Sequence, residues 1–278
     1  MKEIEKKFGF VVTLLISLTY LLFASELRGN QIAFFYALDA DFKELKRELG
    51  GTVSTIEVGG TSISLIKSKG LTVVAAAMKP GPVETAVTAE AVLGRFPCRF
   101  AISVGPVGSL KDSVKVSEWG FIDSLVPYQK VSGNTEGSGS VETTTILFDT
   151  EIRELFNHPN LSDWKPEDRP SWTASSGEKF IASSSERKQI QRIGGTEVVE
   201  MNLFGLDSAL KRRRIKGVHL RVVSDHADES AHEDFLNFVE SYDGLGGRLC
   251  ADVLKRLAPD PNSPTSYRGL RSLIDEQK

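Results

Sequence analysis

The sequence predicts a three-layer α/β/α sandwich with a mixed central sheet. Between residues 31 and 257, short apolar runs typical of buried strands alternate with longer amphipathic segments typical of helices. This interleaving is typical of a sheet covered by helices on both faces. A chain of 278 residues that is 40% hydrophobic and 26% charged can bury one sizeable core. We therefore expect one folded domain, residues 30–278, behind a separate N-terminal segment, residues 1–29.

The first third of this domain predicts strands and helices in turn. The strands are apolar runs bounded by turn residues, with glycines at 59–60 and 70 between them. The helices carry apolar residues at helical spacing. The expected strands are residues 31–37, 52–58, 62–67 and 71–77, and the expected helices are residues 39–49 and 83–93.

The middle third begins with an apolar strand, residues 100–104, which leads into a tight turn at residues 105–108, Gly-Pro-Val-Gly. Residues 118–125 form the next strand. Residues 132–140 are a polar glycine and serine stretch that cannot pack a core, so this stretch is either an exposed connection or a lid over a pocket. A short helix, residues 149–157, ends before a proline, and a loop then runs to residue 174.

The last third predicts three more strands and three more helices. The run at residues 211–214, Lys-Arg-Arg-Arg, closes one of these helices, because cations complement the negative end of a helix dipole. The expected strands are residues 178–182, 197–201 and 217–223, and the expected helices are residues 184–191, 203–213 and 231–257, followed by a loosely packed tail after residue 259.

The N-terminal segment has the pattern of a signal peptide. Lys2, Lys6 and Lys7 precede an uncharged apolar stretch, residues 8–24, and a polar stretch follows. We expect export, periplasmic or secreted, with cleavage near Ala24. The stretch of about 17 residues is also at the short end of what spans a bilayer, so an uncleaved membrane anchor is the alternative. A buried helix of the domain fits less well, because the stretch is apolar on nearly every face.

Charge and cysteine content argue against several functional classes. A net charge of −3 and a pI near 5.9 provide no electrostatic reason to bind nucleic acid. The two cysteines, Cys98 and Cys250, form neither a disulfide framework nor a metal-ligand spacing. His226 and His232 have no third ligand at a useful spacing. We therefore expect no metal and no organic cofactor.

The most informative run is a strand that ends in Ser224-Asp225, followed by His-Ala-Asp. Such a strand places one carboxylate at the C-terminal edge of a sheet, where open α/β folds bind their ligands. With Glu200-Met201-Asn202 upstream, the run resembles the nucleoside phosphorylase and nucleosidase superfamily, and it is most similar to the 5'-methylthioadenosine/S-adenosylhomocysteine nucleosidases. The resemblance covers residues 31 to about 257 and implies a nucleoside phosphorylase-like fold.

The resemblance implies two catalytic residues. In these nucleosidases the matching aspartate protonates the leaving purine, so Asp225 is the expected general acid; capping a following helix is its alternative role. Residues 36–41 resemble the family's first strand and its Gly-Ala-Met-Glu-Glu-Glu run, whose last glutamate orients the attacking water. Asp41 takes that place with a side chain one methylene shorter. Equally, Asp41 is an acidic residue in the first turn of a helix.

The resemblance also implies the residues around the nucleoside. Phe180 matches a phenylalanine that stacks on the purine, although plain core packing is its alternative. Asn202 replaces the glutamate that grips the ribose, and an amide can bond a diol but brings no charge. The expected substrate-binding residues are Val107, Gly108, Phe180, Ile181, Glu200, Met201, Asn202, Arg221 and Ser224.

These observations predict a purine nucleosidase that hydrolyses an adenine-type nucleoside, a small-molecule substrate. Ser103 and Pro106 stand where phosphorolytic relatives hold phosphate with an arginine and a serine, so water is the expected nucleophile. A phosphate-dependent phosphorylase is therefore a weaker alternative. A catalytically weakened nucleoside-binding or storage protein on the same fold is another, because of Asn202 and Asp41. The resemblance implies a homodimer.

Overall fold

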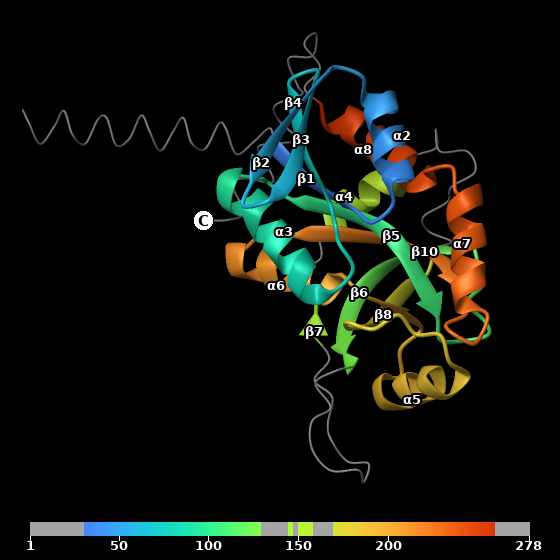
Figure 1. The fold of residues 1–278 in the computed structure, drawn as a ribbon. Helices are drawn as coiled ribbons and strands as arrows, with labels where there is room; N and C mark the ends of the chain where they lie inside the picture. Colours follow the sequence, from blue (N-terminus) through green and yellow to red (C-terminus); the bar gives the residue numbers. More distant parts are fainter. Residues whose placement is uncertain (1–30, 129–143, 147–149, 158–168, 259–278) are drawn as a thin grey trace, which may run out of the picture.

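The computed structural model describes residues 31–128, 144–146, 150–157 and 169–258 (Figure 1). The predicted signal or anchor, the polar stretch at residues 132–140 and the tail after residue 259 lie outside these ranges. Within them, no helix is both long enough and apolar enough to cross a membrane.

One mixed sheet of ten strands runs through the described part of the chain. β1 lies between β4 and β5 and is parallel to both, whereas β3 runs antiparallel to its neighbours β2 and β4. The strands are β1 Gln31–Tyr36, β2 Thr52–Val58, β3 Thr61–Ser68, β4 Leu71–Ala77, β5 Ala101–Ser109, β6 Trp119–Pro127, β7 Thr144–Thr145, β8 Ser171–Ser176, β9 Val198–Glu200 and β10 Gly217–Asp225.

Half of this sheet closes on itself. β5 pairs with β9, β9 with β8, β8 with β6 and β6 with β10, and β10 pairs in turn with β5. The closed arrangement leaves these strands without a free edge there. It also brings the C-terminal end of β10 beside the end of β5.

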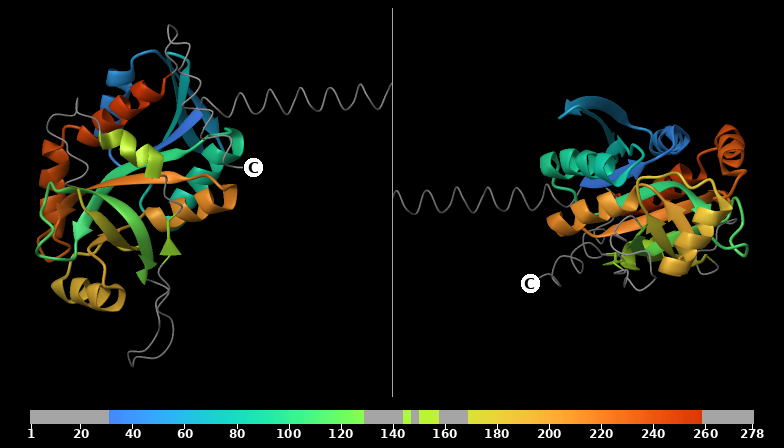
Figure 2. Two further views of the ribbon diagram at one scale, coloured as in Figure 1. Left: turned by 180° about the vertical axis from the view of Figure 1, so that it is seen from behind. Right: turned by 60° about the horizontal axis from the view of Figure 1, so that its bottom comes forward.

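Helices cover both faces of the sheet, so the predicted three-layer α/β/α architecture with a mixed sheet is confirmed (Figure 2). β1 shows why. Phe34 faces a core that includes residues of α2 and α8, and Phe35 faces the opposite core with α3 and α6, as the two-residue period of a strand requires. The helices are α2 Asp39–Leu49, α3 Pro82–Arg95, α4 Thr150–Glu154 with the 3-10 turn η2 Leu155–Asn157, α5 Ser184–Gly194, α6 Leu203–Arg213, α7 Ala231–Ser241 and α8 Leu245–Leu257.

The predicted single helix over residues 231–257 is wrong. The chain forms α7 and α8, and they are separated by Tyr242-Asp243-Gly244. Gly244 has a φ of 75°, and a Cβ there would lie 2.4 Å from the Ala40 carbonyl oxygen. The break therefore lets the chain turn closely over the start of α2.

The predicted turn at residues 105–108 is also wrong, because β5 continues through it to Ser109. The glycines serve close approach instead: a Cβ on Gly105 would lie 2.9 Å from that of Ala37. The predicted strand at residues 178–182 is likewise absent, and the strand is β8, in the segment expected to be a loop. The polar sequence of β8, Ser-Trp-Thr-Ala-Ser-Ser, does not predict a strand, but it pairs with both β6 and β9.

Candidate active site

Asp225 ends β10 at the C-terminal edge of the sheet. The pairing of β10 with β5 shifts register between Val223 and Asp225, and Asp225 lies opposite Gly108. A bulge of this kind re-aims a side chain. A Cβ on Gly108 would approach Asp225 Oδ1 to 2.9 Å, so the absence of a side chain there makes room for the carboxyl group.

The Asp225 carboxyl group is buried, with 2% of the residue exposed. The backbone N–H of Ala227 donates to its Oδ1 at 2.9 Å, and the Ser224 hydroxyl donates to its Oδ2 at 2.7 Å. Burial raises the pKa of Asp225, and these two hydrogen bonds oppose the rise. The site therefore favours a carboxyl group that holds its proton to a higher pH than an exposed aspartate does.

The Ser224 hydroxyl suits both protonation states of Asp225. Its oxygen lies 2.7 Å from Asp225 Oδ2 and 3.2 Å from the Val107 carbonyl oxygen, and it has one hydrogen to donate. When Asp225 is ionised, the hydroxyl donates to the carboxylate. When Asp225 is protonated, the hydroxyl can donate to Val107 and accept from the carboxyl group, so neither state leaves it unpaired.

An apolar cluster adjoins Asp225 and Gly108. Val199 and Ala227 flank the position of a Gly108 side chain, at 3.2 Å each, and both belong to a buried cluster with Leu110, Ile181 and Ile190. Predicted site residues Val107, Gly108, Ile181, Ser224 and Asp225 are thus neighbours. Such apolar surroundings disfavour the charged form of the carboxyl group.

Asp41, in the first turns of α2, is only 1% exposed. Its Oδ1 accepts from the Tyr242 hydroxyl at 2.5 Å and from the Gly247 N–H at 3.0 Å, while the buried Oδ2 has no partner among the described residues. Burial raises the pKa of Asp41 to about 6, against the opposing effect of these donors, Arg221 and Arg248. A residue that only interacts with the helix dipole needs no such burial, so the dipole alone does not explain the environment of Asp41.

Arg221 is buried in β10, four residues before Asp225, with 1% exposure. Its Nη1 donates to the Leu220 carbonyl at 2.7 Å and to the Ser103 hydroxyl at 3.2 Å, and its Nη2 has no partner among the described residues. Burial lowers the pKa of Arg221 to about 10, although Glu200 and Asp41 raise it. The guanidinium therefore stays charged at neutral pH and attracts the carboxylates of Glu200 and Asp41.

Ser103 and His219 complete this buried polar cluster, and sequence analysis missed the role of both. The Ser103 oxygen lies 2.8 Å from His219 Nδ1, and burial lowers the pKa of His219 to about 3, so the imidazole is neutral. Because Arg221 can only donate, Ser103 accepts from it. The direction of the bond between Ser103 and His219 Nδ1 depends on the tautomer of the neutral ring, and the buried Nε2 has no partner among the described residues. The pair is separated by more than a hundred residues, so no local pattern marks it.

Replacing Ser103 with alanine should destabilise the fold by about 1 to 3 kcal/mol, because it leaves a buried donor on Arg221 and the buried Nδ1 of His219 without their partner. Urea unfolding measures the change. Ser208→Ala is the matched control, since the exposed Ser208 hydroxyl bonds only to the Phe204 carbonyl of its own helix. Equal stability of both variants would contradict the proposed network.

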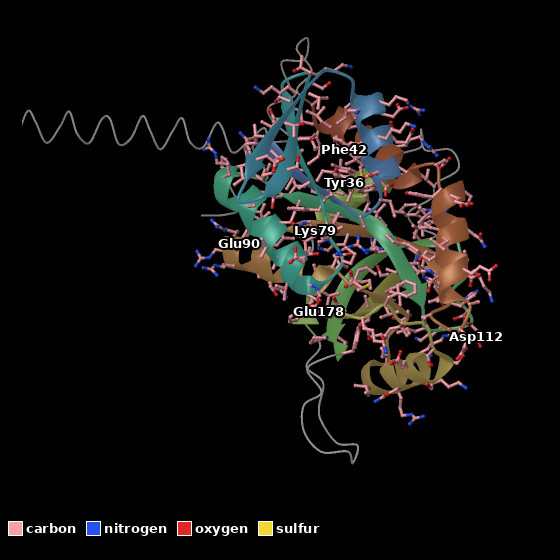
Figure 3. All side chains as sticks on the ribbon, viewed as in Figure 1. Tyr36, Phe42, Lys79, Glu90, Asp112 and Glu178 are labelled. Carbon is pink, nitrogen blue, oxygen red and sulfur yellow. The ribbon has the colours of Figure 1, made fainter. Side chains whose placement is uncertain are left out.

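The predicted ribose-binding residues make structural contacts in this molecule. Glu200 is buried, and its carboxylate accepts from the N–H groups of Asn202 and Leu203 at the start of α6. The Asn202 amide donates to the Lys79 carbonyl at 2.7 Å and to the Thr85 hydroxyl at 2.8 Å. Asn202 therefore ties β9 to the connection before α3, where Figure 3 labels Lys79. A glutamate cannot donate these bonds.

Met201 and Phe180, two further predicted substrate-binding residues, are both half-buried. Met201 is half-buried, and its carbonyl accepts from the Gly81 N–H at 3.1 Å. Phe180 is half-buried and meets Phe235 of α7 edge to face, with ring centroids 5.8 Å apart. Its ring is thus neither in the main core nor fully exposed.

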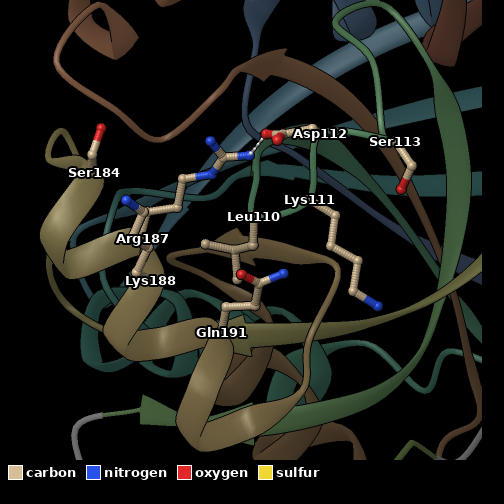
Figure 4. Close-up of a pocket in the computed structure, with 8 residues that line it drawn as sticks. All are labelled: Leu110, Lys111, Asp112, Ser113, Ser184, Arg187, Lys188 and Gln191. Carbon is tan, nitrogen blue, oxygen red and sulfur yellow. Dashed lines mark hydrogen bonds and ion pairs between the residues drawn. The ribbon is translucent and has the colours of Figure 1, made fainter.

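A polar hollow of about 310 Å³ lies between α5 and the segment after β5 (Figure 4). Arg187 and Asp112 form an ion pair of 2.7 Å at this hollow. It contains none of the predicted site residues, and it shares only Leu110 with the apolar cluster beside Asp225. The lining residues are Leu110, Lys111, Asp112, Ser113, Ser184, Arg187, Lys188 and Gln191.

Solved structures of nucleosidases share this fold. Futalosine hydrolase of Helicobacter pylori, in a mutant form, is 17% identical, with a TM-score of 0.70 over 81% of this chain and 99% of its own. The 5'-methylthioadenosine/S-adenosylhomocysteine nucleosidase of Neisseria meningitidis, in complex with methylthio-immucillin-A, is 20% identical, with a TM-score of 0.69 over 81% and 99%. The Helicobacter pylori nucleosidase of that name is 18% identical, with a TM-score of 0.67 over 81% and 96%.

Sequence comparison gives the family. No curated protein sequence matches the chain. The family model described as the phosphorylase superfamily matches residues 22–255, which include every strand and almost every helical residue of the described fold. The chain belongs to the phosphorylase superfamily.

Proposed function

We propose that the protein is a purine nucleosidase that hydrolyses the N-glycosidic bond of an adenine-type nucleoside. The observation that carries the proposal is the Asp225 carboxyl group: buried, raised in pKa, and set beside an apolar cluster at the C-terminal edge of the sheet. Perturbed carboxyl groups in such positions are candidates for acid catalysis. The fold shared with nucleosidases, one of them bound to a nucleoside analogue, supports it.

The reaction requires a proton donor beside the leaving purine. The bond from C1' of the sugar to N9 breaks through an oxocarbenium-like transition state, and the electron pair leaves with the purine. In our proposal the protonated Asp225 donates to N7 as this charge develops. Ser224 and the Ala227 N–H then hold the carboxylate that remains. A positioned acid of this kind contributes about 10²- to 10⁴-fold to the rate.

The chemistry also requires a nucleophile at the sugar. Asp41 Oδ2 and Arg221 Nη2 are buried polar atoms without a partner among the described residues. Buried polar groups of this kind are usually satisfied by ordered water. We propose that Asp41, ionised, accepts a proton from the water that attacks C1', and that Arg221 stabilises its charge. Ser103 is already engaged by His219 and Arg221, which favours water over phosphate as the nucleophile.

The test is base release by the intact protein from a panel of nucleosides, with and without phosphate, followed by chromatography. The panel comprises methylthioadenosine, S-adenosylhomocysteine, adenosine, inosine and futalosine. We expect free base and free sugar from an adenine nucleoside at a rate that phosphate does not change. Release that depends on phosphate, with a sugar 1-phosphate as the product, would identify a phosphorylase instead.

We expect kcat/KM to fall as the pH drops through about 6, because Asp41 works ionised and its pKa in the protein without substrate is about 6. Activity is therefore present above this value and lost below it. Asp225 works protonated, so it sets the opposite limb, which falls as the pH rises. A pH–rate profile with Asp41→Asn as the comparison checks this assignment. A kcat/KM that stays constant between pH 5 and pH 7 would contradict it.

One observation favours a second candidate, a nucleoside-binding protein with weakened catalysis. Asn202 lacks the charge that a glutamate would bring to the ribose. Its amide hydrogens are also already bonded to the Lys79 carbonyl and the Thr85 hydroxyl. Calorimetric binding of methylthioadenosine without any base release would select this candidate. Complete conversion of an excess of added nucleoside to free base would exclude it.

A further inference from the structure

The break between α7 and α8 brings Tyr242 onto Asp41, two hundred residues earlier in the chain. The Tyr242 hydroxyl donates to Asp41 Oδ1 at 2.5 Å and accepts from the Gly246 N–H at 2.9 Å. The Gly247 N–H donates to the same Asp41 oxygen at 3.0 Å. The first turn of α8 thus supplies one N–H directly to the carboxylate and another to its tyrosine partner.

Two glycines permit this contact. A Cβ on Gly246 would lie 2.9 Å from Asp41 Oδ1, and a Cβ on Gly247 would lie 1.9 Å from the Asp41 backbone oxygen. Any side chain at residue 247 therefore collides with backbone, which cannot turn away. The start of α8 is shaped to touch α2 at the one aspartate to which we assign the attacking water.

The Tyr242 hydroxyl is itself held firmly. Its ring stacks on Phe238, with centroids 5.1 Å apart, and lies tilted against Trp119 at 6.2 Å. Burial and Asp41 raise the pKa of Tyr242 far above its usual value, so the hydroxyl keeps its proton. Tyr242 is therefore a permanent donor in a fixed place.

The consequence is an asymmetric carboxylate. Oδ1 receives both described donors, and Oδ2 receives none. A carboxylate free to rotate would exchange its two oxygens, whereas one pinned through Oδ1 keeps Oδ2 in one direction. An aspartate reaches less far than the family's glutamate, so its orientation matters more.

We propose that Tyr242 is a positioning residue that pins Asp41 through one oxygen, so that the other oxygen meets the attacking water. The inference rests on the proposed function, in which Asp41 orients that water. Nothing in the family resemblance assigns a role to residue 242. The pattern that marks the device is Tyr242 with the glycines at 244, 246 and 247, four residues whose packing all converges on the start of α2.

Other charged groups around Asp41 stay in place when Tyr242 is changed. Arg221 of β10 and Arg248 of α8 both lower the pKa of Asp41. Arg248 lies 3.6 Å from Glu44 of α2. The Cys250 thiol of α8, buried and near enough to feel the charge of Asp41, has its own pKa raised well above its usual value and stays neutral. Removing the tyrosine hydroxyl therefore takes one donor from Asp41, and it also leaves the Gly246 N–H without its acceptor.

The experiment compares Tyr242→Phe with the intact protein on an adenine nucleoside between pH 5 and pH 9. Loss of one hydrogen bond to a charged group should move the acid limb up by about one pH unit. With Asp41 at about 6, this shift alone lowers kcat/KM about fivefold at pH 6 and very little at pH 8. Loss of the fixed orientation of Asp41 lowers kcat further, by the same factor at both pH values, and KM stays the same. Ser241→Ala is the matched control, because its hydroxyl bonds only within α7.

A stability cycle tests the same contact without catalysis. Tyr242→Phe, Asp41→Asn and the double variant are unfolded in urea at pH 8, and we expect the two single effects not to add. Additive effects would overturn the inference, as would an acid limb that stays in place. If the intact protein releases no base at any pH, the proposed function fails, and the cycle alone then decides whether Tyr242 fixes Asp41.

Discussion

Asp225→Asn is expected to lower kcat for base release by about 10²- to 10⁴-fold, because asparagine has no proton to give to the leaving purine. The substitution keeps the shape of the side chain. Its oxygen can still accept from the Ala227 N–H, and its amide can donate to the Ser224 hydroxyl. Burial penalises the charged form of Asp225, so removing the charge should not destabilise the fold.

Asp228→Asn is the matched control for this variant. Asp228 follows three residues later, and its carboxylate accepts from the N–H and hydroxyl of Ser230 just before α7. It has no assigned part in the reaction. We expect steady-state chromatography to show near-normal kcat for Asp228→Asn. A similar, small loss for both variants would mean that Asp225 merely caps the following segment.

Arg221→Met is expected to destabilise the fold by about 3 to 5 kcal/mol at pH 8, because it removes a buried positive charge that compensates the carboxylates of Glu200 and Asp41. Arg212→Met is the matched control. The side chain of Arg212 is 80% exposed, so its loss should change the free energy of unfolding by less than about 0.5 kcal/mol.

The loss on Arg221→Met should be smaller at pH 5 than at pH 8. The pKa of Asp41 is about 6 in the fold against 3.8 as its reference value, and removing Arg221 raises it further. A carboxyl group whose pKa is higher in the folded state favours folding when it is protonated, so stability declines as the pH rises past the reference value. Urea unfolding at both pH values measures this. A loss that is the same at pH 5 and pH 8 would show that Arg221 does not compensate Asp41.

Much of the fold was predictable because the sequence is locally consistent. Asp39–Leu49 and Leu203–Arg213 have the predicted helix bounds, and Thr52–Val58 and Leu71–Ala77 the predicted strand bounds. Apolar periodicity determines these elements without help from distant residues. β8 was not predicted because its sequence is rich in serine and threonine. It is a strand because it pairs with β6 on one side and β9 on the other, not because of its own propensity.

The division between α7 and α8 escaped for a similar reason. The sequence predicts one helix across residues 242–244, whereas Gly244 has a φ of 75° and a Cβ there would lie 2.4 Å from the Ala40 carbonyl oxygen. The turn predicted at residues 105–108 is wrong because its glycines allow close approach of Ala37, just after β1, and of Asp225 at the end of β10, and they do not form a local bend. Glycine indicates that something unusual happens to the backbone, and tertiary contacts decide what it is.

The candidate site divides in the same way. The family resemblance identified Asp225, Ser224 and Arg221, and the structure places them together on β10. Tyr242, Ser103 and His219 carry no local signal, since each matters through a partner far away in the sequence. The sequence predicts Asn202 as a weakened ribose ligand, whereas its bonds to Lys79 and Thr85 give a structural reason for the residue.

Turnover of 7-deazaadenosine beside adenosine tests the central claim most directly, because carbon replaces the N7 atom that Asp225 is proposed to protonate. The measurement is free base released by the intact protein, with a competition experiment to show that the analogue binds. Our account predicts that 7-deazaadenosine inhibits adenosine hydrolysis competitively and releases no measurable base. Release of 7-deazaadenine at a rate close to that of adenine would contradict proton donation from Asp225 to the departing purine.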